Sequence, residues 1–190
     1  MLCLRQLLLP DQQFKQITPA EFLSEAQRLA AAHEEYDNMT VAVVTDQQVY
    51  NEFSSGTPDA SAYRWLMKML YDRANASGGT IHKPRYLCLF GDGTFDNRKL
   101  ISLSNSGNNW LLTYQSKNSV NEVKAYATDD YFGFLDDNEG EVDVNGRMDI
   151  GVGRIPVNSL EQATGVVDKT IRYIKGENKG KWKNQLIFVA

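Results

Sequence analysis

The chain has 190 residues, of which 42% are hydrophobic and 11% aromatic, with 20 basic and 24 acidic residues and a formal net charge of −4. This length and composition suit one globular domain with a real hydrophobic core and exclude a disordered chain. No Lys/Arg-rich run marks a nucleic-acid surface and no apolar run approaches the roughly 18 residues of a membrane span, so neither a nucleic-acid partner nor a transmembrane segment is expected.

Residues 1–17 are expected to form an edge strand or a linker upstream of the domain. The opening MLCLRQLLLP has an apolar patch that stops at Pro10 and lacks a small-residue cleavage site, so a signal peptide is not predicted. The two cysteines, Cys3 and Cys88, are too few for a disulfide framework and do not fix the cellular compartment.

The next two elements are predicted to be a helix and a buried strand. In ITPAEF, Thr18 is a helix cap, Pro19 takes the first helical position and Glu21 completes a capping box. Apolar residues then recur at helical spacing, which predicts a helix over 19–36 with one buried face. The β-branched run MTVAVVT predicts a buried strand at 39–45.

A second helix and a second strand follow in the same order. Thr57 as the cap and Pro58 after it predict a helix over 59–76. The apolar run RYLCLF predicts a buried strand at 85–90, and GDGTFDNR, residues 91–98, is the loop that leaves its carboxyl end.

The region 126–156 contains eight acidic residues, and Glu122 just upstream makes nine. Short strands are predicted at YFGFL and VDV, with a turn at Asp137–Gly140 between them. Asn145–Gly146 supplies the two positive φ values of a type I′ turn. These signals predict a β-hairpin over 131–147.

The sequence of the last part of the chain, residues 158–190, predicts one more helix and one more strand. Asn158 as the cap, with Glu161 three residues on, predicts a helix over 159–175. The apolar run NQLIFVA predicts a strand over 185–190, so the chain stops inside an apolar strand. An ending at this point suggests a truncated domain.

This alternation of apolar strands and amphipathic helices predicts an α/β fold. Strands that are apolar on both faces are typical of a mainly parallel sheet flanked by helices on each side. The hairpin is expected to project from this sheet. The strands of that sheet are expected near residues 40–45, 85–90, 148–153 and 185–190. In such open sheets the functional site lies beyond the carboxyl ends of the strands.

The acidic region fails the spacing of a calcium loop of the EF-hand type. That loop needs glycine at position 6 and glutamate at position 12, but counting from Asp136 places Gly140 at position 5 and Arg147 at position 12. Solvated turn carboxylates are therefore expected. A less regular calcium site formed by Asp136, Asn138 and Asp143 stays open as an alternative.

A nucleotide-binding loop is not expected either. The FGDG sequence at 90–93 does not extend to G-x-G-x-x-G, because Asp96 occupies the position of the last glycine. Asp92 would also repel an anion. Gly91 and Gly93 are interpreted as residues that permit a tight exit from the strand.

No catalytic constellation is found among the cysteines and histidines. Cys88 lies in the middle of an apolar strand, where a thiol is usually an inert core residue. His82 precedes that strand and is expected to be solvated, about 20 Å from Cys88 along an extended chain. His33 lies on the inner face of the first helix, where a core or boundary histidine is expected.

Several stretches together resemble the gingipain-type cysteine peptidases, peptidase family C25. The similar stretches follow one another with the family's spacing over residues 18–190, and two of them, NEFSSGTPD and TYQS…TDDYFG, are most similar to the sortases or signal peptidases of type IX secretion within that family. The stretches lie at 49–64, 84–98, 113–119, 127–140, 149–163 and 166–174.

The resemblance implies a caspase-like fold and a Cys/His peptidase that removes carboxyl-terminal sorting signals from type IX secretion cargo. The family's catalytic His stands in an H-G motif and its Cys in an A-C-x-x-G-like motif, and neither motif occurs here. The expectation is that residues 18–190 are the amino-terminal part of the domain, inactive alone, with the dyad downstream of Ala190.

By the same resemblance, the protein is expected at the cell surface, outer membrane or periplasm of a Bacteroidetes-type bacterium. Its partners would be a protein or peptide substrate and other secretion components, and no cofactor is required. Two alternatives remain: a non-enzymatic scaffold or adhesion domain that keeps the family's first half, and a nucleotide-binding domain, which the missing glycine fingerprint disfavours.

Overall fold

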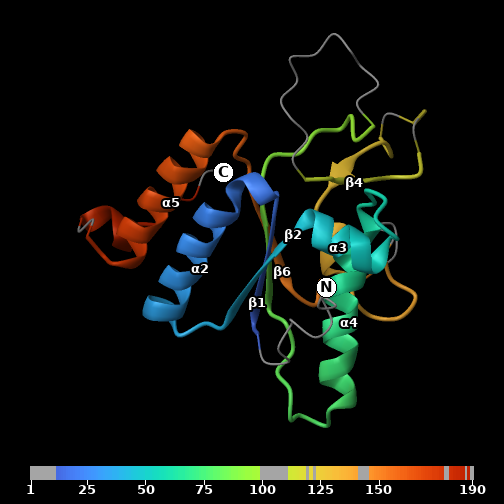
Figure 1. Ribbon diagram of the computed structural model, residues 1–190, viewed down its shortest axis with the longest axis horizontal. Coiled ribbons are helices and arrows are strands. Elements are labelled where there is room, and N and C mark those ends of the chain that lie inside the picture. Colours follow the sequence, from blue (N-terminus) through green and yellow to red (C-terminus); the bar gives the residue numbers. More distant parts are fainter. Residues whose placement is uncertain are drawn as a thin grey trace.

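The computed structural model describes residues 12–98, 111–118, 120–121, 123–140, 146–177, 180–186 and 188. A four-stranded parallel sheet stands at the centre, with α2 and α5 on one face and α3 and α4 on the other (Figure 1). Its strands are β1 (Phe14–Thr18), β2 (Val41–Thr45), β3 (Tyr86–Phe90) and β6 (Gly151–Ile155). The predicted α/β class and the three predicted strands among these four are confirmed.

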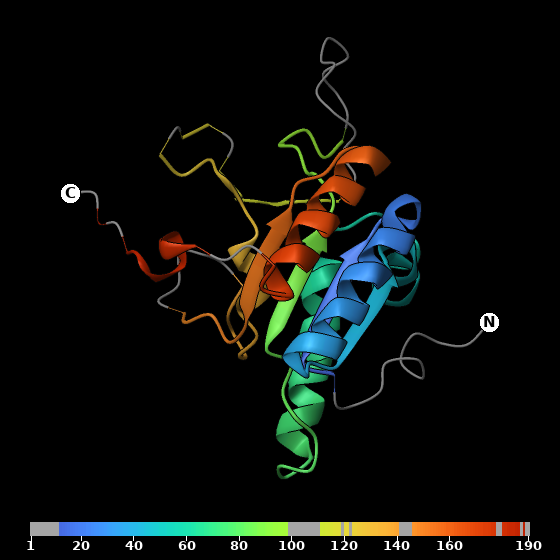
Figure 2. The same cartoon turned by 90° about the vertical axis from the view of Figure 1, so that its left-hand side faces the viewer.

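The strand order is β2-β1-β3-β6, and every pair is parallel. The strands begin at one level, because Phe14 pairs with both Val41 and Tyr86, and Tyr86 pairs with Gly151. Their carboxyl ends therefore meet along one edge of the sheet. Figure 2 shows the four strands side by side, with α2 and α5 lying across the near face.

β1 lies in the interior of the sheet, between β2 and β3, and all five of its residues are buried. The expectation of an edge strand or linker over residues 1–17 is therefore wrong for residues 14–17, while residues 1–11 lie outside the described part of the chain. The strand was not predicted from the sequence because the polar residues Lys15 and Gln16 interrupt its apolar pattern.

The first helical region begins later than the sequence predicted. Thr18 is the last residue of β1 rather than a helix cap, and its hydroxyl donates to the Phe90 carbonyl oxygen at 3.2 Å. A short 3-10 helix, η1 (Ala20–Phe22), follows, and then α2 (Leu23–Asp37). The Thr18 hydrogen bond thus links the end of β1 to the end of β3, and α2 then runs back across the face of the sheet.

The second helical region is split in two. The sequence analysis missed α3 (Asp46–Phe53), which begins directly after β2 with a capping box between Thr45 and Gln48. α4 runs over Ser61–Ala76, so Thr57 is not its cap.

The last helix is α5 (Leu160–Ile174), and Ser159 rather than Asn158 caps it by accepting a hydrogen bond from the Gln162 N–H. Beyond it lies η3 (Lys181–Asn184). The predicted strand at 185–190 is not seen at residues 185, 186 and 188, and residues 187, 189 and 190 lie outside the described part.

The acidic region folds differently from the predicted hairpin. YFGFL is not a strand, because η2 (Asp130–Gly133) occupies most of it. The turn at 137–140 is observed, with Asn138 at φ 67°. Residues 141–145 lie outside the described part, and with them Asn145 and Asp143. A small antiparallel sheet of β4 (Tyr114–Gln115) and β5 (Ala127–Thr128) was not predicted.

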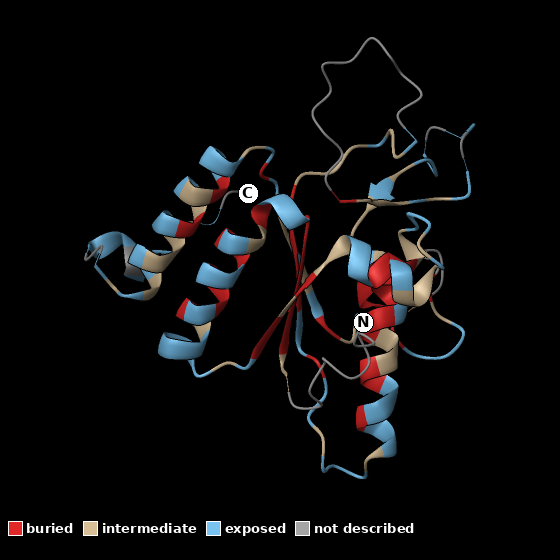
Figure 3. Ribbon diagram, viewed as in Figure 1, coloured by how far each residue is buried: buried red, intermediate tan, exposed pale blue. Residues whose placement is uncertain are grey.

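Two hydrophobic cores cover the two faces of the sheet, and Figure 3 shows buried residues along the strands and the inward helix faces. The core under α3 and α4 includes Ile17, Leu66, Met67, Leu87 and Leu89. The core under α2 and α5 includes Phe14, Phe22, Leu29, Phe90 and Val167. In the described part of the chain, no helix has the length and apolar character that a membrane span needs.

Candidate functional site

The carboxyl edge of the sheet is the candidate site, because sites of open α/β sheets form there. Four chain segments meet at this edge: the loop after β3, the segment 111–113 that leads into β4, the turn before η2 and the end of β6. One side chain, Arg154 on β6, contacts the other three segments.

The Arg154 guanidinium forms a bidentate ion pair with Asp129. Its Nε donates to Asp129 Oδ2 at 2.7 Å and its Nη2 donates to Asp129 Oδ1 at 2.8 Å. The remaining donors reach the carbonyl oxygens of Gly91 at 3.0 Å, Leu111 at 3.3 Å and Leu112 at 3.0 Å. Bidentate arginine–carboxylate pairs of this kind fix geometry as well as contributing energy. Arg154 therefore holds the loops of this edge in one arrangement.

The glycines after β3 allow the loop to pack closely against this frame. A Cβ added at Gly93 would lie 2.9 Å from Thr113 Cγ2 and 3.0 Å from Arg154 Nη1. A Cβ at Gly91 would lie 3.2 Å from Leu111 Cγ. The sequence-based interpretation of a tight exit from the strand agrees with this packing.

The backbone N–H groups at the start of the same loop, residues 91–93, already donate hydrogen bonds. The Gly91 N–H donates to the Ile155 oxygen, the Asp92 N–H to the Val157 oxygen, and the Gly93 N–H to the Asp92 carboxylate. Phosphate-binding loops depend on unpaired N–H groups aimed at the ligand. Residues 91–93 therefore offer no free N–H group to a phosphate.

Aromatic side chains connect this edge to the helices behind it. Tyr114 of β4 stacks on Tyr131 of η2, with ring centroids 3.9 Å apart. The hydroxyl groups of Tyr50 and Tyr63 hydrogen-bond to each other in the core between α3 and α4. Burial raises the pKa of Tyr50 and that of Tyr63, so both phenols stay protonated at neutral pH.

Arg64 of α4 holds the acidic region against the body of the domain. Its Nε donates to the Phe134 oxygen at 2.7 Å and its Nη2 donates to the Glu139 oxygen at 2.8 Å. Gly140 lies beside it with φ 122°, in a conformation that favours glycine. A buried arginine thus fixes this loop against α4.

A cluster of three carboxylates does form here, but it differs from the set that the sequence suggested. Oxygens of Asp136, Glu139 and Asp149 lie within 4.8 Å of one another. Asn138, by contrast, lies at the exposed turn, and Asp143 is outside the described residues. The folded chain brings in Asp149, which is 13 positions from Asp136 and carried no local signal.

Most of these oxygens already accept hydrogen bonds. The Tyr71 hydroxyl contacts Asp136 Oδ1 at 3.0 Å and Asp149 Oδ1 at 3.1 Å. The Leu135 N–H donates to Asp149 Oδ2 at 2.8 Å. Burial, and then the hydrogen bond to Asp136, raise the pKa of Tyr71 to about 12, so this donor keeps its proton.

We expect calcium to bind the cluster no more tightly than about 1 mM, the weak end of known protein sites, because Tyr71 and backbone N–H groups occupy the oxygens. A calorimetric titration of the chain with CaCl₂ measures this affinity. Asp136→Ala is the test variant, and Glu161→Ala on α5 is the distant acidic control. Micromolar affinity that disappears only in Asp136→Ala would show that the loop is a calcium site.

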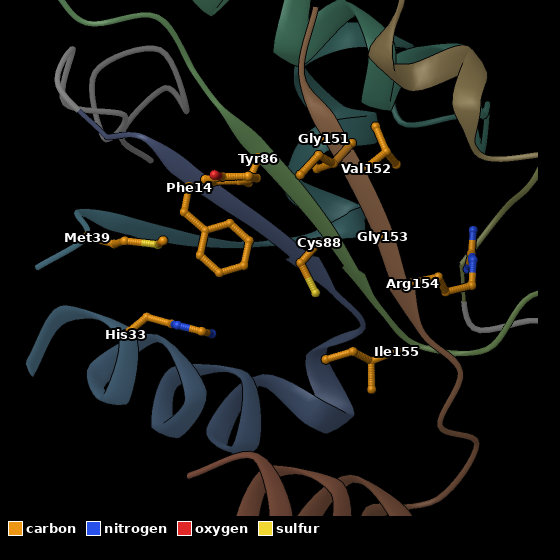
Figure 4. A pocket seen from close by; sticks show the side chains of 11 residues that line it. Phe14, His33, Met39, Tyr86, Cys88, Gly151, Val152, Gly153, Arg154 and Ile155 are labelled. Atoms are coloured by element: carbon orange, nitrogen blue, oxygen red, sulfur yellow. The ribbon is translucent and has the colours of Figure 1, made fainter. Parts of the chain in front are cut away.

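An apolar cavity of about 430 Å³ lies between α2 and the sheet, and both Cys88 and His33 line it (Figure 4). His33 Nδ1 contacts Asp37 Oδ2 at 2.7 Å, and the imidazole ring packs edge-on against Phe14. Burial raises the pKa of Cys88 to about 12. The sequence analysis considered Cys88 and His82 as a nucleophile–base pair, whereas in the folded chain Cys88 and His33 line the same cavity.

This pair does not form a nucleophile and its base. In the described part of the chain, Cys88 has no hydrogen bond to either histidine, and a thiol with this pKa is not ionised at neutral pH. The carboxyl edge itself holds an ion pair, carbonyl oxygens and hydroxyl groups. Residues of this kind can position loops around a site, but the described residues place no activated nucleophile there.

Comparison with known proteins agrees with this geometry. The model of peptidase family C25 matches residues 10–190 of the chain. A solved structure of dimeric latent PorU from Porphyromonas gingivalis is similar in fold, with a TM-score of 0.77 and 41% sequence identity. That match covers 92% of this chain and 16% of the PorU chain, so this chain spans less than a fifth of that protein's length. No curated protein matches the chain.

Proposed function

The chain belongs to the gingipain-like peptidase family C25, and on that premise we propose that it forms part of the catalytic domain of a cysteine peptidase. In this proposal the catalytic His and Cys follow Ala190. The chain contributes the sheet and the loop frame held by Arg154. The observation that carries the proposal is the family match over residues 10–190, which includes every strand of the sheet.

We further propose that the whole protein resembles PorU in its role and removes carboxyl-terminal sorting signals from exported proteins at the cell surface. The support is the 41% identity with PorU over 92% of this chain. In such a reaction a Cys thiolate attacks the scissile carbonyl carbon and a His protonates the leaving amine. Transfer of the acyl group to an amine instead of water would make the same enzyme a transpeptidase, or sortase.

The 190-residue chain itself is expected to be inactive as a peptidase. Its described cysteine, Cys88, is buried in the core, and the carboxyl edge lacks a thiol in the described residues. Incubation of the purified chain with a peptide library under reducing conditions, read by mass spectrometry, measures cleavage directly. We expect none above a blank, in the original chain and in Cys88→Ala alike. Thiol-dependent cleavage that Cys88→Ala abolishes would contradict the proposal.

A further inference from the structure

A further cavity, the hairpin pocket, lies between the loop after β3 and the β4–β5 hairpin. Its volume is about 250 Å³, and all the residues that line it are uncharged. They include Phe95, Gln115, Ala125, Tyr126 and Ala127. This volume is below the roughly 300 Å³ at which pockets for drug-sized ligands begin, so it suits a single side chain. An ionised group in such a lining would lose its water without gaining an opposite charge.

Hydrogen bonds hold the wall of the hairpin pocket that the loop after β3 supplies. Thr113 Oγ1 donates to the Thr94 oxygen at 3.2 Å, and Asn97 Nδ2 donates to the Thr113 oxygen at 2.7 Å. The Gln115 side-chain amide donates to the Phe95 oxygen. These bonds tie the loop along the outer side of β4, while the Phe95 side chain stays 68% exposed. The pocket therefore has an aromatic wall on a fixed loop.

The hairpin pocket lies next to the segments that Arg154 joins. Leu111 and Leu112, whose oxygens accept hydrogen bonds from Arg154, lead into β4. The Leu111 N–H also donates to the Asp92 oxygen at 3.0 Å. Asp129, the ion-pair partner of Arg154, directly follows β5. Figure 1 shows β4 beside the loop after β3, at the end of the molecule where the strands of the main sheet finish. The pocket is thus part of the edge that forms the candidate site.

β5 has backbone groups that point away from β4. The Ser116 N–H donates to the Tyr126 oxygen at 3.0 Å, which makes these two residues a hydrogen-bonded pair of the antiparallel ladder. The next pair, Gln115 and Ala127, is therefore a non-hydrogen-bonded pair, so the Ala127 N–H and C=O face outward. Within the described residues no strand pairs with that side of β5. An edge of this kind can accept an extended peptide.

We propose that the outer edge of β5 and the hairpin pocket form a substrate subsite, an inference that rests on the proposed peptidase function. An extended substrate peptide pairs with Ala127, and the residue opposite Ala127 places its side chain on the same face of the sheet. Gln115 and Ala127 lie on the face that carries the pocket, whereas Tyr114 on the other face stacks against Tyr131. The subsite therefore selects an uncharged side chain and disfavours lysine, arginine, aspartate and glutamate at this position.

Disulfide capture measures the preference of the pocket without any catalysis. Ala125 lines the pocket and is exposed, so Ala125→Cys places an accessible thiol there, in a chain with Cys3→Ser and with the buried Cys88 retained. The probes are acetyl-leucyl-cysteinamide, acetyl-arginyl-cysteinamide and acetyl-aspartyl-cysteinamide, equilibrated with 2-mercaptoethanol and read by mass spectrometry. The leucyl probe should be captured about ten-fold more than either charged probe.

The matched control for this capture is Val123→Cys. Val123 is 90% exposed on the same loop and does not line the pocket, so its cysteine should prefer no probe by more than about two-fold. Equal capture of the leucyl and charged probes at position 125, or the same preference at position 123, would overturn the proposal.

The cleavage specificity of the protein extended beyond Ala190 tests whether the pocket serves the reaction. Ala125→Asp adds a carboxylate to the lining. In peptide-library profiling it should raise kcat/KM about ten-fold for substrates with lysine or arginine at one position, and Val123→Asp should not. Ala127→Pro removes the outward N–H, which the hairpin does not use, and should raise KM about ten-fold while kcat changes less than about two-fold.

The outcomes separate this inference from the proposed function. If the longer protein cleaves its substrates with the same side-chain preference in Ala125→Asp as in the original chain, the subsite is overturned while the peptidase function stands. Complete absence of cleavage would instead contradict the proposed function, and with it the role of the pocket as a substrate subsite. The capture yields at positions 125 and 123 would then decide the side-chain preference of the pocket by themselves.

Discussion

Replacing Arg154 by alanine is expected to lower the free energy of unfolding by about 3 kcal/mol, the cost of breaking a largely buried ion pair by removing one partner. The substitution leaves the Asp129 carboxylate without its cation and three carbonyl oxygens without a donor. Side-chain exposure is only 12% for Arg154 and 23% for Asp129, so water replaces few of these bonds. The three segments that Arg154 contacts at the carboxyl edge should all become more mobile in this variant.

Urea unfolding followed by fluorescence measures this loss. Arg154→Lys keeps the positive charge but cannot form the bidentate pair, so it should recover only part of the stability. Arg147→Ala removes an exposed arginine seven positions earlier and should change the stability by less than about 0.5 kcal/mol. A loss of less than about 1 kcal/mol in Arg154→Ala would show that the frame does not depend on this residue.

Replacing Lys15 by methionine is expected to stabilise the protein at neutral pH by about 2 kcal/mol. Lys15 is 1% exposed on the interior strand β1, and burial lowers its pKa from 10.5 to about 7. One pKa unit is worth about 1.4 kcal/mol, so the cost of charging the amine has a ceiling of about 5 kcal/mol. The hydrogen bond from Nζ to Gln12 Oε1 at 2.8 Å, which methionine loses, offsets part of the gain.

The pH dependence separates this effect from simple packing. Between pH 7 and 10.5 the unfolded chain holds the Lys15 proton that the folded chain has released, so the stability of the original chain rises with pH across that window. The advantage of Lys15→Met should therefore be largest at or below pH 7 and should shrink toward pH 10.5. Urea unfolding at several pH values measures it, with Lys169→Met on the exposed side of α5 as the control. A difference that does not vary with pH would contradict the lowered pKa.

Lys15 also explains where prediction from the sequence succeeded and where it failed. Strands with continuous apolar runs, such as 41–45 and 86–90, were predicted within two residues of their observed bounds. β1 was missed because Lys15 and Gln16 lie buried within it, and a buried amine cannot be inferred from a local pattern. α3 was missed because its cap, Thr45, is also the last residue of a strand.

The contacts that form the candidate site could not be predicted from local sequence patterns, for a different reason. Arg154 joins residues that are 25 to 63 positions away in the sequence, and none of these contacts has a spacing that a motif would show. Asp129 appeared only as one of many acidic residues, and Tyr71 appeared in no candidate site at all. The glycines after β3 were noticed, but the close approach that requires them depends on Thr113 and Arg154.

A cleavage assay tests the central proposal most directly. The enzyme is the protein encoded by the reading frame extended beyond Ala190, and the substrate carries a carboxyl-terminal sorting signal. The account predicts thiol-dependent cleavage by the longer protein, its loss when the cysteine of the downstream A-C motif becomes alanine, and no cleavage by the 190-residue chain. A longer protein that carries intact H-G and A-C motifs and still leaves the substrate uncut would contradict the account and favour a scaffold role.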